Sequence, residues 1–178
     1  MGPFSFRLFG PSRSERDAEA LYGAVLAAAR QPALFGSGRA PDTFDGRFEM
    51  VVALAAFAFM RLKAAPEASR LAQDFADRLF QGLDESLREA GVGDLSVARH
   101  MKGLARRVYG RVQVYGDAIE AGDATTLADA LTRNIWNGTL TPFAADMAQW
   151  MIGCWREIAA APLADLLAVQ RWPAPPVA

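Results

Sequence analysis

The chain has 178 residues, a formal net charge of −1 and 52% apolar residues. This length suits one domain with a substantial core, and the near-zero net charge excludes a general electrostatic attraction to nucleic acid or to anionic lipid. The single cysteine, Cys154, excludes an internal disulfide framework and fits a reducing compartment.

Residues 1–13 are predicted to form a flexible apolar N-terminal segment, and we do not expect it to be a targeting sequence. Arg7 and two prolines interrupt its phenylalanines, so its apolar run is much shorter than the core of a signal peptide. The first predicted helix follows with Ser14 as its N-cap. It ends at about Arg30, because Pro32 stops it.

The second predicted helix is apolar on every side. It runs from about Gly46 to Lys63, after a loop at 31–45 that is rich in Gly and Pro signals. Within it, residues 50–60 (MVVALAAFAFM) form the longest uninterrupted apolar run of the sequence. A membrane-spanning helix needs about 20 such residues, so we expect a helix that is buried in the protein core.

The third and fourth predicted helices differ in charge. The third begins at Pro66 and ends with Gly91 as its C-cap. Residues 67–94 hold seven acids and only three bases. The fourth helix comes next, and residues 95–116 hold five Lys or Arg residues and no acid. The sequence therefore sorts its charges between two neighbouring helices.

Shorter helices complete the predicted fold. A fifth helix ends at Asn137, a sixth begins at Thr141, and a short seventh is expected over 162–169. Residues 171–178 form a Pro-rich tail that does not continue it. Because no segment has the pattern of a strand, residues 14–170 are predicted to form an all-α, single-domain bundle of six to seven helices with short connections.

The fourth helix is amphipathic, and its polar side is basic. On a helical wheel its apolar stripe centres on Val108 and Met101, and Lys and Arg residues occupy the opposite side and one flank. This basic side is either a solvated face balanced by the acidic third helix, or a docking surface for an acidic loop, ribosomal RNA or lipid headgroups. The candidate partner-binding residues are Arg99, Lys102, Arg106, Tyr109 and Arg111.

Two glycines interrupt the same helix. Gly103 and Gly110 are seven residues apart, so they lie on one side of it, next to the basic flank. Each weakens a helix by up to ~1 kcal/mol relative to alanine, which is easiest to understand where another backbone or a ligand comes close. We favour a crossing helix over a binding groove at this position.

Signatures of catalysis and of metal binding are missing. His100 is the only histidine and Cys154 the only cysteine, so a His-based triad, a paired-cysteine site and a two-histidine site each lack members. We therefore expect no enzyme activity, no cofactor and no metal. The residues alone leave three alternatives: a haem-handling protein with His100 as ligand, a peripheral membrane protein with an N-terminal apolar wedge, and a nucleic-acid regulator, for which no recognition-helix motif is present.

Three segments, 45–62, 75–115 and 127–138, together resemble the ubiquinol–cytochrome c chaperone family, whose members are assembly factors for the cytochrome bc1 complex. The resemblance covers roughly residues 43–138. Family members often carry a histidine in the apolar helix, near the position that Leu54 occupies in this sequence. The residues that match the motifs of the family are Gly91, Gly93, Asp94, Tyr109, Gly110, Arg111, Arg133 and Asn134.

The resemblance implies an all-helical, non-enzymatic chaperone that binds newly synthesised cytochrome b and supports assembly of respiratory complex III. Its mitochondrial relatives work near the ribosome with a small helper protein. It suggests a bacterial protein on the cytoplasmic side of the respiratory membrane, in transient contact with that membrane, and DNA is not an expected partner. The basic side of the fourth helix would then meet charged groups, and Tyr109 would meet apolar parts of the client.

Overall fold

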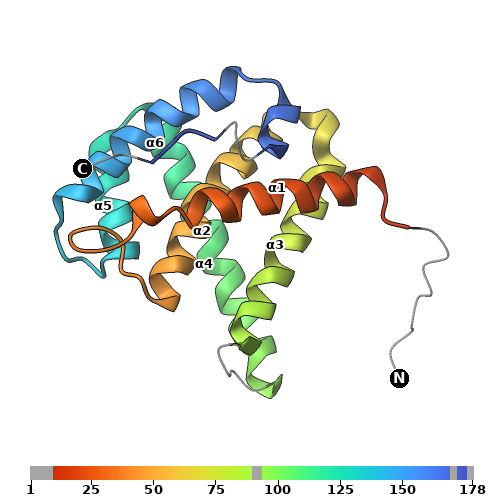
Figure 1. The fold of residues 1–178 in the computed structure, drawn as a ribbon, viewed down its shortest axis with the longest axis horizontal. Helices are drawn as coiled ribbons and strands as arrows, with labels where there is room; N and C mark the ends of the chain where they lie inside the picture. The colour runs from red at the N-terminus through yellow and green to blue at the C-terminus, as the bar shows by residue number, and fades with distance from the viewer. Residues whose placement is uncertain (1–9, 90–93, 169–171, 176–178) are drawn as a thin grey trace.

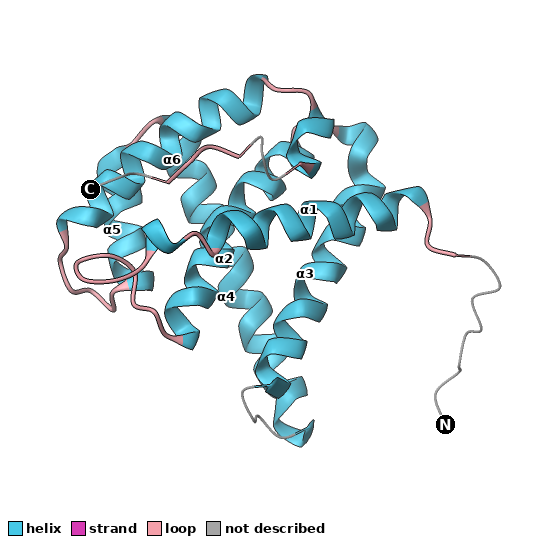
Figure 2. Ribbon diagram, in the orientation of Figure 1, coloured by secondary structure: helices cyan, strands magenta, loops and turns pink. Residues whose placement is uncertain are grey.

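The computed structural model describes residues 10–89, 94–168 and 172–175, and the side chains of residues 94–100 lie outside this description. The described part consists of α-helices and short 3-10 helices, with one isolated bridge between Phe35 and Ala40 and no strand (Figures 1 and 2). The predicted all-α single-domain bundle is confirmed. Its helices are α1 (Arg13–Ala29), α2 (Phe44–Lys63), α3 (Ser69–Glu89), α4 (Asp94–Ala121), α5 (Ala124–Ile135) and α6 (Pro142–Ala160), with 3-10 helices at Pro32–Leu34, Pro66–Ala68 and Leu163–Leu167.

Helix α2 is the centre of the bundle. It packs against each of the other five α-helices, and α1 crosses in front of it in Figure 1. Within the predicted apolar run 50–60 every residue is buried except Phe59, which is half-buried. A helix with neighbours on all sides has no polar face, which explains the unbroken run of apolar residues. No helix of the described chain is long and apolar enough to cross a membrane.

The starts of α1 and α2 differ from the prediction. Ser12, and not Ser14, is the N-cap of α1: the Ser12 hydroxyl accepts a hydrogen bond from the Glu15 backbone N–H at 3.2 Å, and the Ser12 N–H donates to the Glu15 carboxylate at 2.7 Å. This reciprocal capping box satisfies two backbone donors. Helix α2 begins two residues before Gly46, because Thr43 is its cap and accepts from the Gly46 N–H at 3.1 Å.

The later boundaries agree more closely. Thr141 caps α6 as predicted. Pro66 opens a 3-10 turn, and α3 itself begins at Ser69. The predicted C-cap of α3, Gly91, lies outside the described residues. The last helical segment is the 3-10 helix Leu163–Leu167, which is shorter than the predicted 162–169.

Trp172 fills part of the core, although it follows the last helical segment. Its ring meets Phe57 of α2 edge-on with centroids 6.3 Å apart, and its Nε1–H donates to the Leu166 carbonyl at 3.1 Å. Trp150 of α6 donates to the Ala174 carbonyl at 2.6 Å. The described part of the Pro-rich tail therefore packs against the bundle. No periodic pattern marks an isolated tryptophan after the last helix, so this contact could not be predicted from the sequence.

We predict that Trp172→Ala lowers the free energy of unfolding by about 3 kcal/mol, because truncation of a buried tryptophan leaves a cavity next to Phe57. Urea unfolding followed by circular dichroism measures the loss. Leu140→Ala is the control, since Leu140 is 86% exposed. Equal stability of wild type and Trp172→Ala would show that the tail does not contribute to the core.

Candidate client-binding surface

One buried ion pair attaches α4 to α2. Arg111 Nη2 donates to Glu49 Oε1 at 2.7 Å, and Arg111 Nε lies 2.6 Å from Glu49 Oε2. The two side chains are only 14% and 7% exposed. Arg111 was predicted to bind the client, but its guanidinium is occupied by this internal carboxylate. The wheel placed Arg111 on a flank of α4, and the buried acid 62 positions earlier left no local signal in the sequence.

The environment of Glu49 is weakly solvated. Burial raises the pKa of the Glu49 carboxyl to about 7, against the opposing influence of Arg111 and Arg107.

Tyr115, one turn after Arg111, is fully buried, and its hydroxyl accepts a hydrogen bond from Asn134 Nδ2 at 2.9 Å. Two residues of the family motif, Arg111 and Asn134, therefore attach α4 to α2 and α5. Arg133, their neighbour in the motif, is exposed.

The opposite side of α4 faces solvent. Lys102 and Arg106 are exposed, as predicted, and Arg107 is exposed beside them. Neither Lys102 nor Arg106 forms an ion pair within the described part of the chain. The side chain of Arg99 lies outside the described residues, as do Gly91, Gly93 and the side chain of Asp94.

Among the described side chains, no acid of α3 forms an ion pair with the basic side of α4. Among the described residues, the ion pairs of α3 lie within the helix, as between Arg70 and Asp74 at 3.0 Å, or join it to Glu19 of α1. This arrangement favours the docking interpretation of the basic side over the interpretation as a balanced, solvated face.

Gly103 and Gly110 lie in open space on the same outward side. A Cβ added at either glycine would meet no atom within 4 Å, so the expectation of a helix crossing at these positions is wrong. Gly116 of α4 does lie against α2, because an added Cβ there would lie 3.4 Å from Met60 Cγ. The reason is rotational: Arg111 and Tyr115 turn toward α2, which leaves the two glycines on the far side.

The outer face of α4 consists of Lys102, Gly103, Arg106, Arg107, Gly110 and Val114. By the 100° step of an α-helix, all of these residues except Lys102 lie within an arc of roughly a quarter turn, and Lys102 borders the arc. The face combines cationic side chains with two positions that have no side chain, so a partner can approach the helix backbone closely.

Tyr109 borders this face and joins it to an aromatic cluster. Its ring is 49% exposed and lies 6.0 Å from the ring of Phe59 in α2 and 5.5 Å from the ring of Phe80 in α3. Phe59 in turn meets Phe75 edge-on at 5.1 Å. Tyr109 thus offers apolar surface at the position predicted, and the cluster beneath it keeps the ring in place.

Metal ligands do not gather among the described side chains, where no group of three His, Cys, Asp or Glu residues lies together. Cys154 is buried, and burial raises the pKa of its thiol to about 12, so it stays protonated at neutral pH. The side chain of His100, the predicted alternative haem ligand, lies outside the described residues.

The profile of the family described as ubiquinol-cytochrome C chaperone matches residues 37–172. The chain belongs to this family. The crystal structure of the Cbp3 homolog from Brucella abortus has a similar fold, with a TM-score of 0.78 and 39% sequence identity, over 88% of this chain and 87% of that chain. A search of the curated proteins found no match. The family match extends past residue 138, the point where the resemblance in the sequence ended.

We predict that Arg111→Leu lowers the free energy of unfolding by about 3 kcal/mol at pH 8, since the Glu49 carboxylate then stays buried without its partner. Because the pKa of Glu49 is raised from 4.5 to about 7 in the folded state, the carboxyl becomes neutral below that value and needs no cation. The decrease in the free energy of unfolding should therefore be smaller at about pH 5. Urea unfolding at both pH values measures it.

Arg13→Leu is the control for this measurement, because Arg13 forms an exposed pair with Asp17 in α1. It should have little effect at either pH. An Arg111→Leu protein that is as stable as wild type at pH 8 would show that the ion pair does not hold α4 in place.

Proposed function

We propose that this chain is a non-enzymatic assembly chaperone of the cytochrome bc1 complex that binds newly synthesised cytochrome b. Membership of the ubiquinol–cytochrome c chaperone family supports the assembly role. The outer face of α4 supports the proposal that the client binds at a defined place. There, cations without an ion pair in the described chain lie beside two open glycines.

The chemistry of this face fits an inserted or emerging membrane protein. Lys102 and Arg106 offer charge to acidic loops at the ends of apolar segments, and the exposed ring of Tyr109 offers apolar contact. Gly103 and Gly110 allow the backbone of such a segment to lie against α4. A client with charged loops and apolar helices needs both kinds of contact.

We further propose that the chaperone works at the cytoplasmic, inner face of the respiratory membrane. Because cytochrome b is a membrane protein, its chaperone must act near the bilayer. Exposed Lys and Arg side chains also favour transient contact with anionic headgroups. A ribosome and a small helper protein are additional expected partners, and DNA is not.

We predict that the double variant Lys102→Glu/Arg106→Glu recovers cytochrome b roughly tenfold less efficiently than wild type, because each substitution replaces attraction with repulsion of acidic client groups. The tagged chain is purified from solubilised membranes of the native organism, and cytochrome b is quantified by its haem spectrum and by mass spectrometry. Arg13→Glu/Arg156→Glu is the control, since it makes the same charge change at exposed residues of α1 and α6. Equal recovery by a folded Lys102→Glu/Arg106→Glu protein would contradict the proposal.

Alanine substitution of the two open glycines separates binding from stability. Gly103→Ala/Gly110→Ala should stabilise the fold by up to ~1 kcal/mol per site, yet lower the recovery of cytochrome b, because two methyl groups then hold the client away from the helix backbone. Gly23→Ala is the control, since Gly23 is an equally open and exposed glycine within α1. It should raise stability and leave recovery unchanged. Undiminished recovery with Gly103→Ala/Gly110→Ala would show that the client does not approach this face closely.

A further inference from the structure

An apolar groove lies where α1, α2 and α3 meet. It has a volume of about 330 Å³. Phe44, in the first turn of α2, is 47% exposed at this groove. The apolar lining consists of Tyr22, Leu26, Phe44, Phe48, Val51 and Leu83, and we call it the Phe44 groove.

The floor of the Phe44 groove is rigid. Tyr22, Phe48, Val51 and Leu83 are each less than 10% exposed. The Tyr22 ring is fixed from two sides, because the Arg78 guanidinium lies 4.2 Å from its centroid and Gly82 leaves room for its hydroxyl, where a Cβ would clash. A partner would therefore find the floor already formed, with Phe44 exposed at its edge.

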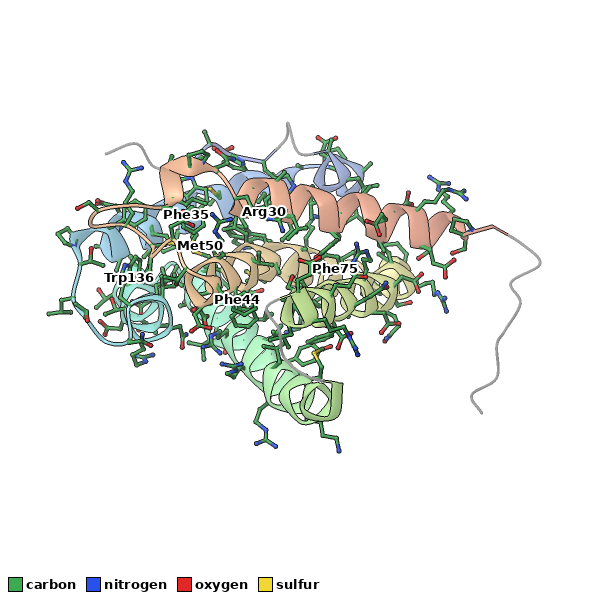
Figure 3. The ribbon with its side chains drawn as sticks, turned by 60° about the horizontal axis from the view of Figure 1, so that its bottom comes forward. Arg30, Phe35, Phe44, Met50, Phe75 and Trp136 are labelled. Atoms are coloured by element: carbon green, nitrogen blue, oxygen red, sulfur yellow. The ribbon has the colours of Figure 1, made fainter. Side chains whose placement is uncertain are left out.

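Two arginines line the groove. Arg30 and Arg47 belong to its lining, and they also line a second hollow of about 290 Å³ beside Phe35. Figure 3 shows Arg30 at the end of α1, Phe35 in the following loop and Phe44 at the start of α2. Arg47 pairs with exposed Asp42, but Arg30 forms no side-chain ion pair among the described residues. Glu89 is the one acid in the described lining.

Arg107 connects the Phe44 groove to the outer face of α4. Its guanidinium lies 5.6 Å from the centre of the Phe48 ring, which belongs to the floor of the groove. Arg107 is itself exposed and belongs to the outer face. The two surfaces are therefore adjacent, and one bound partner can reach both.

We propose that the Phe44 groove binds an amphipathic helical peptide segment whose apolar residues pack on Phe44 and Phe48, and whose carboxylates pair with Arg30. This inference rests on the proposed function and names the part of the client that the chaperone holds. An open groove of this size takes a few side chains at helical spacing. Arg30, which forms no ion pair among the described residues, favours acidic flanks.

The test uses the purified full-length chain and a fluorescent helical peptide of about five turns, with Leu at positions i, i+3, i+4 and i+7 and Glu beside them. An analogue carries Lys in place of Glu. Fluorescence anisotropy should show preference for the Glu peptide. Arg30→Glu should weaken binding of the Glu peptide by about five- to tenfold and strengthen binding of the Lys analogue. Phe44→Ser should weaken binding of both peptides by about tenfold, because a large apolar contact is lost.

Leu140→Ser is the matched control, because it also replaces an exposed large apolar residue, in the loop between α5 and α6. It should bind both peptides as wild type does. The inference is overturned if Arg30→Glu leaves the preference between the peptides unchanged or if neither peptide binds. It is also overturned if phosphatidylglycerol vesicles bind in a Phe44-dependent way and the Glu peptide does not, since the occupant would then be lipid.

Recovery of cytochrome b by Arg30→Glu and Phe44→Ser chains distinguishes this inference from the proposed function. Loss of recovery with Lys102→Glu/Arg106→Glu, together with normal recovery with Arg30→Glu and Phe44→Ser, would keep the chaperone function and overturn the groove as its binding place. Peptide binding that follows the predicted pattern, without recovery of cytochrome b by the wild-type chain, would keep the groove and overturn the identity of the client.

Discussion

The ion pair between Arg111 and Glu49 fixes the rotation of α4 against α2, and the rest of the functional surface depends on that rotation. Two charges that leave water must meet each other with good geometry, since either one alone in the core is costly. Only one rotation of α4 brings Arg111 to Glu49 and at the same time buries Val108 and Tyr115. Lys102, Arg106 and the two open glycines then face outward.

Helix α2 provides the support that makes this surface rigid. Because the other five α-helices pack against it, it offers fixed positions for Glu49, Phe48 and Phe59. Glu49 holds α4, Phe48 forms the floor of the groove under Arg107, and Phe59 lies behind Tyr109. The polar and apolar parts of the proposed binding region are therefore built on one central helix.

Local sequence signals predicted the helices well and the contacts between distant helices poorly. The apolar run 50–60 and the cap at Thr141 act within a few residues, so they were readable. Ser12 and Ser14 each have an acid three residues later, and the glutamate after Ser12 was the better sign of a capping box. Glu49, the partner of Arg111, and Phe57, the ring that Trp172 meets, lie far away in the sequence, and no pattern identifies them. The wheel placed Gly103 and Gly110 on the correct side, but it does not show whether a neighbouring helix covers that side.

Site-specific photocrosslinking in the native organism tests the central claim most directly, namely that the outer face of α4 contacts cytochrome b. A photoreactive residue replaces Arg106, and the same residue at Asp77, exposed on α3, is the control. Adducts are purified through the tagged chain and identified by mass spectrometry. We expect cytochrome b among the adducts from position 106 and not among those from position 77. Adducts from position 106 that contain no cytochrome b, while the folded chain still supports assembly of the bc1 complex, would contradict the claim.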